Sequence, residues 1–269
     1  MEQPKSNFKI VSDKKARMIL PNAITIIGVC IGLSSIKFAL DGKFTLAVIG
    51  ILFAGLMDAL DGRIARLIKG TSKIGKELDS LADVISFGVA PAFIMYFWIL
   101  QYLDKFGWFV CLIYVVCVAL RLARFNVSSN EDTSWKDNFF EGVPAPAGGI
   151  IVLLPLIISF SGFDKIFFII NYDLVVPIFF ITVSLLLIST IPTYSFKKIV
   201  IPRHMTKFLL FGIVLFFGAL LVYTFKILVV SSFVYLSLIP ISYFHYRKIK
   251  KEKNVINETN ENEELEDIL

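Results

Sequence analysis

Long apolar runs alternate with short polar segments along almost the whole chain. At about 1.5 Å of rise per helical residue, each run is long enough to cross most or all of a bilayer core of about 30 Å. The runs lie at residues 22–40, 44–69, 75–100, 106–124, 145–161, 168–190, 207–224 and 227–246. This pattern predicts an all-α, polytopic integral membrane helix bundle with about eight transmembrane helices.

The composition supports a membrane protein and excludes an ordinary soluble domain. Of the 269 residues, 56% are hydrophobic and only 18% are charged, which is too little polar surface for a soluble fold of this length. The net charge of +5 indicates contact with anionic headgroups, not with nucleic acid. The three cysteines lie in apolar segments without the spacing of a zinc site or a disulfide framework.

Basic side chains occur in every second polar segment. They are Lys5, Lys9, Lys14, Lys15 and Arg17, then Arg63, Arg66, Lys69, Lys73 and Lys76, then Arg121 and Arg124, then Lys197, Lys198, Arg203 and Lys207, and finally Arg247, Lys248, Lys250, Lys251 and Lys253. The alternate loops carry little positive charge. Because cytoplasmic loops are enriched in Lys and Arg, we expect a multi-pass cell-membrane protein (inner or plasma membrane) with both termini in the cytoplasm.

The two ends of the chain differ from the apolar middle. Residues 1–21 are expected to form a cytoplasmic arm with an amphipathic interfacial helix at 10–20, before Pro21 starts the first span; a disordered basic arm is the alternative. Residues 22–246 form the predicted transmembrane domain. Residues 247–269 become acidic and rich in Asn, which predicts a disordered cytoplasmic tail.

Four aspartates interrupt the second and third apolar runs. The stretch reads Asp58-x-x-Asp61-Gly62-x-x-Ala65-Arg66, followed after eight residues by Gly75-x-x-x-Asp79-x-x-x-Asp83. Spacings of three and four residues place each pair of aspartates on one helical face. The two pairs are nearly symmetric about a turn near Gly70, so in an antiparallel hairpin all four carboxylates are expected to converge at one depth.

Converging carboxylates in a low dielectric repel one another unless a cation lies among them. Hard oxygen ligands favour Mg²⁺ or Mn²⁺, with Ca²⁺ as a possible non-productive occupant. The surrounding basic residues suit a phosphate-bearing ligand, because divalent ions bridge phosphoryl oxygens. The alternative is a structural network of buried Asp–Arg and Asp–Lys pairs, which four aspartates and two glycines at this spacing do not favour.

At these residues the chain resembles the CDP-alcohol phosphatidyltransferase family, and it matches every position of that family's signature. The resemblance implies six core transmembrane helices, usually in a homodimer, and transfer of a phosphatidyl group from a CDP-linked lipid to an alcohol with release of CMP. It assigns a two-metal site to Asp58, Asp61, Asp79 and Asp83, and makes Asp83 the general base as well. It assigns the CDP pocket to Gly62, Ala65, Arg66 and Gly75.

Three further stretches resemble the phosphatidylserine synthase branch of the family. They begin at Arg121, Glu141 and Ser189, and the resemblance covers roughly residues 18–225. It implies CDP-diacylglycerol and L-serine as substrates. Arg121 and Arg124 are one helical turn apart, and arginine binds carboxylates in a bidentate manner. We therefore expect one or both to hold the serine carboxylate or a phosphate, with Asn126 nearby; simple positive-inside anchoring is the alternative.

Other assignments stay open at this point. Asn22 and Thr25 begin the first span on one face, where they either approach the nucleotide or only cap the helix. Glycerol 3-phosphate or inositol could replace serine, because the aspartate motif does not distinguish acceptors. A different class of protein, a cation-coupled transporter, also carries intramembrane aspartates. Transporters usually show inverted repeats and charges near the midplane, and neither is evident here.

Overall fold

The computed structural model describes residues 13–68, 70, 72–128, 139–162, 171–194 and 205–266. Its helices are α1 Asp13–Leu40, α2 Phe44–Leu67, α3 Lys73–Asp83, α4 Ala90–Trp98, α5 Asp104–Ser128, α6 Ala145–Val152, α7 Leu154–Ser161, α9 Tyr172–Ile188, α10 Thr206–Val222 and α11 Thr224–Glu266. A π-helical turn, η1 (Val84–Val89), joins α3 to α4, and a 3₁₀ turn, η2 (Leu100–Leu103), follows α4. Strands β1 (Phe139–Glu141) and β2 (Pro192–Tyr194) pair antiparallel.

Within the part of the chain that the structure describes, five helical stretches are long and apolar enough to cross a membrane. They are Ile19–Leu40, Phe44–Leu67, Lys73–Trp98, Leu100–Val127 and Thr224–Arg247. The shorter helices α9 and α10 are also apolar. The predicted all-α membrane bundle is therefore confirmed, although the described residues do not establish the count of eight spans.

The expected fifth span differs most from the structure. Instead of one helix over 145–161, the chain forms α6 and α7, which meet at Leu153. Pro155 explains the break, because its ring lacks an N–H and crowds the preceding turn. Most of the expected start of the sixth span lies outside the described residues, and α9 begins at Tyr172.

Both ends of the chain also differ from the expectation. The described part of the N-terminal segment is not a separate interfacial helix, because α1 runs without interruption from Asp13 through Pro21 to Leu40. Proline is tolerated in membrane helices where neighbouring groups satisfy the freed backbone. The expected disordered tail is helical as far as Glu266. No Gly or Pro follows Pro240 in the sequence, so the tail lacks the two residues that disfavour a helix most strongly.

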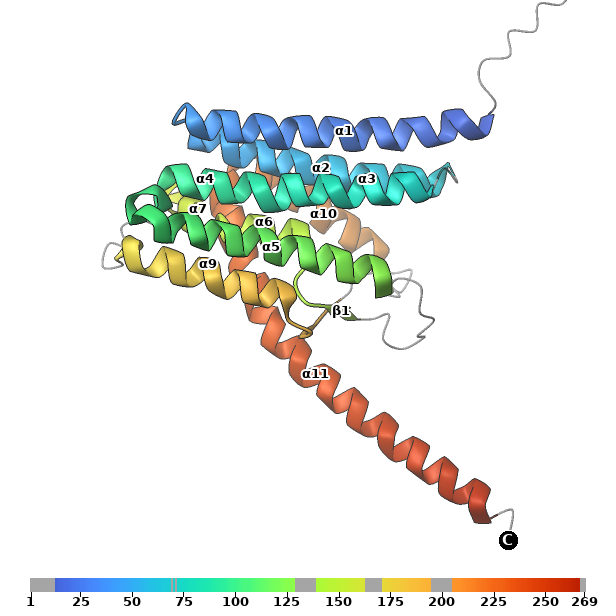
Figure 1. Ribbon diagram of the computed structural model, residues 1–269. Helices are drawn as coiled ribbons and strands as arrows, with labels where there is room; N and C mark the ends of the chain where they lie inside the picture. Colours follow the sequence, from blue (N-terminus) through green and yellow to red (C-terminus); the bar gives the residue numbers. More distant parts are fainter. Residues whose placement is uncertain are drawn as a thin grey trace, which may run out of the picture.

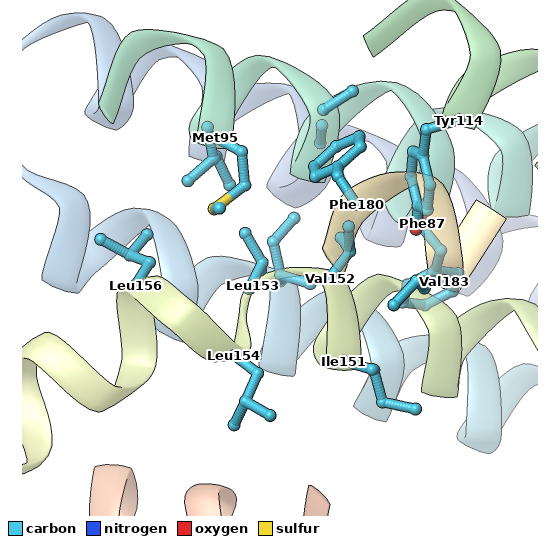
Figure 2. Close-up of a cluster of buried hydrophobic side chains, with 14 of the residues drawn as sticks. Phe87, Met95, Tyr114, Ile151, Val152, Leu153, Leu154, Leu156, Phe180 and Val183 are labelled. Atoms are coloured by element: carbon cyan, nitrogen blue, oxygen red, sulfur yellow. The ribbon is translucent and has the colours of Figure 1, made fainter. Parts of the chain in front are cut away.

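Apolar side chains from several helices form one core. Figure 2 shows Phe87, Tyr114 and Phe180 gathered on one side of α6, with Met95 and Leu156 further along. Small residues let the backbones approach: a Cβ on Gly149 would lie 3.1 Å from Cβ of Phe87. Close approach of this kind is typical of packed membrane helices.

The helices run nearly side by side, so several of their ends lie together. In Figure 1 the N-terminal end of α1, the turn between α2 and α3 and the C-terminal end of α5 lie at the same end of the bundle. Helix α1 packs on α2 and α3, α5 packs on α9, and α11 contacts α7 and β2. The C-terminal part of α11 then projects away from the bundle (Figure 1). This arrangement brings polar residues from distant parts of the sequence to one end.

Candidate active site

A tight helical hairpin positions the acidic residues. The backbone N–H of Gly70 donates to the Ala65 carbonyl at 2.9 Å and closes the last turn of α2. Ser72 then caps α3, its Oγ accepting from the N–H of Gly75 at 2.9 Å. Such a cap satisfies one of the free N–H groups that begin a helix. The short connection therefore returns the chain antiparallel and fixes which residues of α2 and α3 face each other.

Three of the four aspartates meet between these helices. One carboxylate oxygen from each of Asp58, Asp61 and Asp79 can be chosen so that all three oxygens lie within 4.8 Å of one another. Asp61 is buried, with 3% of its surface exposed, and the other two are partly buried. Three carboxylates this close repel one another strongly in a low dielectric. They form a set of hard oxygen ligands that could hold a divalent metal ion.

The fourth aspartate lies one turn deeper. Asp83 lines a small cavity together with Asp58 and Asp61, and its carboxyl lies within hydrogen-bonding reach of the Asp58 carboxyl. The expectation of a single meeting point therefore holds for three carboxylates, with the fourth beside them. The π-helical turn η1 starts directly after Asp83, and such turns occur frequently at functional sites.

Helix α1 supplies a hydroxyl to the acidic cluster. Thr25 Oγ1 lies 2.5 Å from Oδ2 of Asp61 and 3.1 Å from the carbonyl oxygen of Pro21. The hydroxyl has one proton, and the charged carboxylate is the stronger acceptor. Thr25 therefore orients the Asp61 carboxylate, which is a more specific arrangement than the helix cap considered from the sequence.

A cavity of about 190 Å³ opens beside the cluster. Its lining comes from α1, α2, the turn and α3: Pro21, Asn22, Thr25, Asp61, Gly62, Ala65, Gly70, Ser72, Gly75, Lys76 and Asp79. Three of the four residues assigned to the CDP pocket, Gly62, Ala65 and Gly75, are in this set, and so are Asn22 and Thr25, whose role was left open. The fourth, Arg66, is exposed and its Nε donates to the Gly62 carbonyl at 3.0 Å.

The three residues assigned to the acceptor lie in different surroundings. Arg121 is 8% exposed and lies within electrostatic range of Asp83. Arg124 donates from Nη2 to the Ile188 carbonyl at 2.7 Å, at the end of α9. Asn126 donates to Oγ of Ser80 at 2.9 Å and so ties α5 to α3. Only Arg121 is thus buried beside the acidic cluster.

Comparison with known proteins agrees with this geometry. The profile of the CDP-alcohol phosphatidyltransferase family matches residues 18–178, which include the whole hairpin. The chain belongs to the CDP-alcohol phosphatidyltransferase family. The resemblance drawn from the aspartate motif is therefore confirmed, and membership favours an enzyme over the transporter considered above.

Several curated relatives of this phosphatidyltransferase share one name, CDP-diacylglycerol–serine O-phosphatidyltransferase. The Mycobacterium leprae protein is 36% identical over 235 residues, covering 85% of this chain and 76% of the relative. The Mycobacterium bovis protein is 39% identical over 201 residues, covering 71% and 66%. The Helicobacter pylori protein is 36% identical over 182 residues, covering 67% and 74%. The chain thus spans about two thirds to three quarters of the length of these relatives.

Two residues that were not assigned from the sequence also line the cavity of this candidate site. Lys76 lines the cavity, and it precedes Asp79 by three residues, so the helical period already placed it on that face. Ser72 lines the cavity as well, as the cap of α3. A Ser shortly after a Gly at a predicted turn is a recognisable start signal for a helix.

Proposed function

We propose that this protein transfers the phosphatidyl group of CDP-diacylglycerol to the hydroxyl of L-serine, giving phosphatidylserine and CMP. The observation that carries the proposal is the acidic cluster of Asp58, Asp61 and Asp79 at the edge of a cavity in a membrane helix bundle. The shared name of the relatives supports serine as the acceptor. Glycerol 3-phosphate and inositol are the competing acceptors.

The donor set fits a divalent metal ion, Mg²⁺ or Mn²⁺. Asp58, Asp61 and Asp79 would hold it, with Asp83 as a further ligand, and all the donors are carboxylate oxygens. A divalent ion bound there would neutralise charge on the diphosphate and on the leaving CMP. The protein's part is to fix the carboxylates, as Thr25 does for Asp61.

The cavity wall suits a nucleotide diphosphate. A Cβ added to Gly62 would meet no other atom of the described residues within 4 Å, so a ligand can approach the α2 backbone closely there. Ala65 and Gly75 are also small, and the Lys76 ammonium adds a positive charge. These features support the assignment of Gly62, Ala65, Gly75, Asn22 and Thr25 to the CDP side of the site.

The reaction needs one base and one anion-holding group for the acceptor. The serine hydroxyl attacks the β-phosphorus of CDP-diacylglycerol, a new O–P bond forms, and the bond from that phosphorus to the bridging oxygen breaks. CMP leaves with the bridging oxygen, and the hydroxyl proton passes to the Asp83 carboxylate. Arg121, in electrostatic range of Asp83, would hold the serine carboxylate.

The proposal includes the setting of the enzyme. The basic residues Arg63, Lys73 and Lys76 flank the hairpin turn, and this enrichment favours the cytoplasmic side. We therefore propose that the active site opens near the cytoplasmic face of the cell membrane, where serine and CDP-diacylglycerol both reach it. A homodimer is part of the same proposal and is carried by the family resemblance.

The decisive experiment uses the full-length protein purified into lipid nanodiscs. CDP-diacylglycerol is supplied with L-serine, glycerol 3-phosphate or inositol in parallel, and both CMP release and the lipid product are measured with Mg²⁺ or Mn²⁺. We expect phosphatidylserine from serine only, and loss of turnover after chelation of divalent ions.

Matched substitutions complete the test. Asp58→Asn and Asp79→Asn should nearly abolish turnover while the protein stays folded, whereas Asp173→Asn in the first turn of α9 should keep it. A different acceptor in the lipid product would refute serine, and full activity with a chelator would refute the metal site.

A further inference from the structure

We propose that the C-terminal helix α11 completes the acceptor pocket, with Tyr235 donating a hydrogen bond to the carboxylate that Arg121 holds. This assignment rests on the proposed function and adds a binding residue to it. Tyr235 lies outside the segment matched by the family profile, residues 18–178. The observation behind the proposal is a pair of buried polar atoms, on Arg121 and Tyr235, for which the described residues offer no hydrogen-bond partner.

Arg121 is the first member of the pair. Its side chain is 8% exposed, and its Nε has no hydrogen-bond partner among the described residues. A buried N–H of a charged group that lacks a hydrogen-bond partner carries a desolvation cost. The orphaned N–H of Arg121 is therefore available to an anionic ligand.

Tyr235 is the second member. Its ring is partly buried on α11, and its hydroxyl is fully buried without a partner of acceptable geometry in the described part of the chain. The hydroxyl lies within electrostatic range of the Arg121 guanidinium. Strand β2 lies on the same side, where Thr193 approaches the phenol but donates its own proton to the Gly142 carbonyl at 2.8 Å. Since buried polar groups normally find a partner, two buried donors without one, in electrostatic range of each other, are open to one shared acceptor.

The position of the pair favours the amino-acid acceptor over the nucleotide. The cavity beside the acidic cluster is lined by α1, α2, the turn and α3, and neither Arg121 nor Tyr235 lines it. Arg121 lies instead within electrostatic range of Asp83, the proposed base for the serine hydroxyl, and Tyr235 lies within electrostatic range of Arg121. Serine carries its hydroxyl and its carboxylate only a few bonds apart, so their two protein partners must be near neighbours. A planar carboxylate accepts from both a guanidinium N–H and a phenol.

The test compares Tyr235→Phe with the wild-type enzyme in nanodiscs. Because a hydrogen bond to a charged group is lost, the KM for L-serine should rise roughly 10- to 100-fold, while kcat and the KM for CDP-diacylglycerol stay unchanged. Inhibition by L-alanine, which has the carboxylate but no hydroxyl, should weaken by the same factor. Inhibition by ethanolamine, which has no carboxylate, should not change.

Thermal unfolding separates a binding role from a structural one. The lost hydroxyl makes no well-formed hydrogen bond with the described residues, so Tyr235→Phe should unfold at the wild-type temperature. The matched control is Tyr243→Phe on the same helix, where the Tyr243 ring lies against Arg247; it should keep the wild-type KM for serine.

Each other outcome overturns the assignment. An unchanged KM for serine removes Tyr235 from the acceptor pocket. A raised KM for CDP-diacylglycerol with serine unaffected means that the pair binds a phosphate. A lowered unfolding temperature with a general loss of activity means a structural role. None of these results contradicts the proposed synthesis of phosphatidylserine. If the wild-type enzyme makes no phosphatidylserine from serine, however, both the proposed function and this assignment are refuted.

Discussion

The hydroxyl of Thr25 offers the sharpest test of how the acidic cluster is held. Substitution Thr25→Val keeps the size and branching of the side chain but removes the 2.5 Å hydrogen bond to Asp61. Thr25 is 6% exposed and Asp61 is 3% exposed, so water cannot easily replace the lost donor. The Asp61 carboxylate then loses the contact that fixes its orientation towards Asp58 and Asp79.

The size of the effect follows from the kind of bond. A hydrogen bond to a charged group contributes about 1.5–3 kcal/mol, and each 1.4 kcal/mol is a factor of about ten. Groups that orient metal ligands typically change metal affinity by about 10- to 100-fold. We therefore expect Thr25→Val to need about 10- to 100-fold more Mg²⁺ or Mn²⁺ for half-maximal activity, and to approach wild-type turnover at saturating metal.

Two measurements check this expectation. CMP release is followed while the metal concentration is varied, and the thermal stabilisation by metal is measured without substrate. Thr25→Ser keeps the hydroxyl and should behave as wild type. Thr182→Val makes the same chemical change on the exposed face of α9, where the hydroxyl donates to the Ile178 carbonyl of its own helix, and it should alter neither measurement. A wild-type metal requirement in Thr25→Val would refute the orienting role.

Three further substitutions test other parts of the structure. Tyr114→Phe removes the 2.8 Å bond to the Phe87 carbonyl in η1, and the orphaned carbonyl should lower the free energy of unfolding by about 1–3 kcal/mol in denaturant titrations. Gly62→Ala adds a methyl group where no described atom lies within 4 Å, so it should raise the KM for CDP-diacylglycerol without changing the unfolding temperature. Arg124→Met removes the bond to the Ile188 carbonyl and should lower the unfolding temperature while the KM for serine stays close to wild type.

Each of these expectations has a result that contradicts it. Wild-type stability in Tyr114→Phe would mean that the Phe87 carbonyl finds another partner. An unaltered KM for the lipid substrate in Gly62→Ala would place the nucleotide elsewhere. A selective rise of the serine KM in Arg124→Met would return Arg124 to the acceptor pocket, where the sequence pattern placed it.

The acidic hairpin was predictable because its geometry is local. Spacings of three and four residues set the helical faces, and the turn near Gly70 set the register between the two helices. The structure accordingly brings Asp58, Asp61 and Asp79 together. The position of Lys76 beside the cavity follows from the same helical period, because Lys76 precedes Asp79 by three residues.

Other features depend on contacts that no local pattern encodes. The π-helical turn after Asp83 lies inside an apolar run that reads as one uninterrupted helix. The continuous passage of α1 through Pro21 depends on how neighbouring groups satisfy the backbone. The break at Leu153 could have been predicted from Pro155, which follows it. The uninterrupted apolar run over 145–161 favoured a single helix instead.

The difference between local and long-range geometry has a functional consequence. The carboxylates of the hairpin are placed by a turn, a helical period and the Thr25 contact from α1, so the proposed metal and diphosphate chemistry depends on the first three helices. The proposed acceptor pocket needs α5 to bring Arg121 into electrostatic range of Asp83, and α11, packed on α7 and β2, to bring Tyr235 into range of Arg121. Substitutions in the packing of α11 should therefore change which alcohol is accepted before they change phosphatidyl transfer itself.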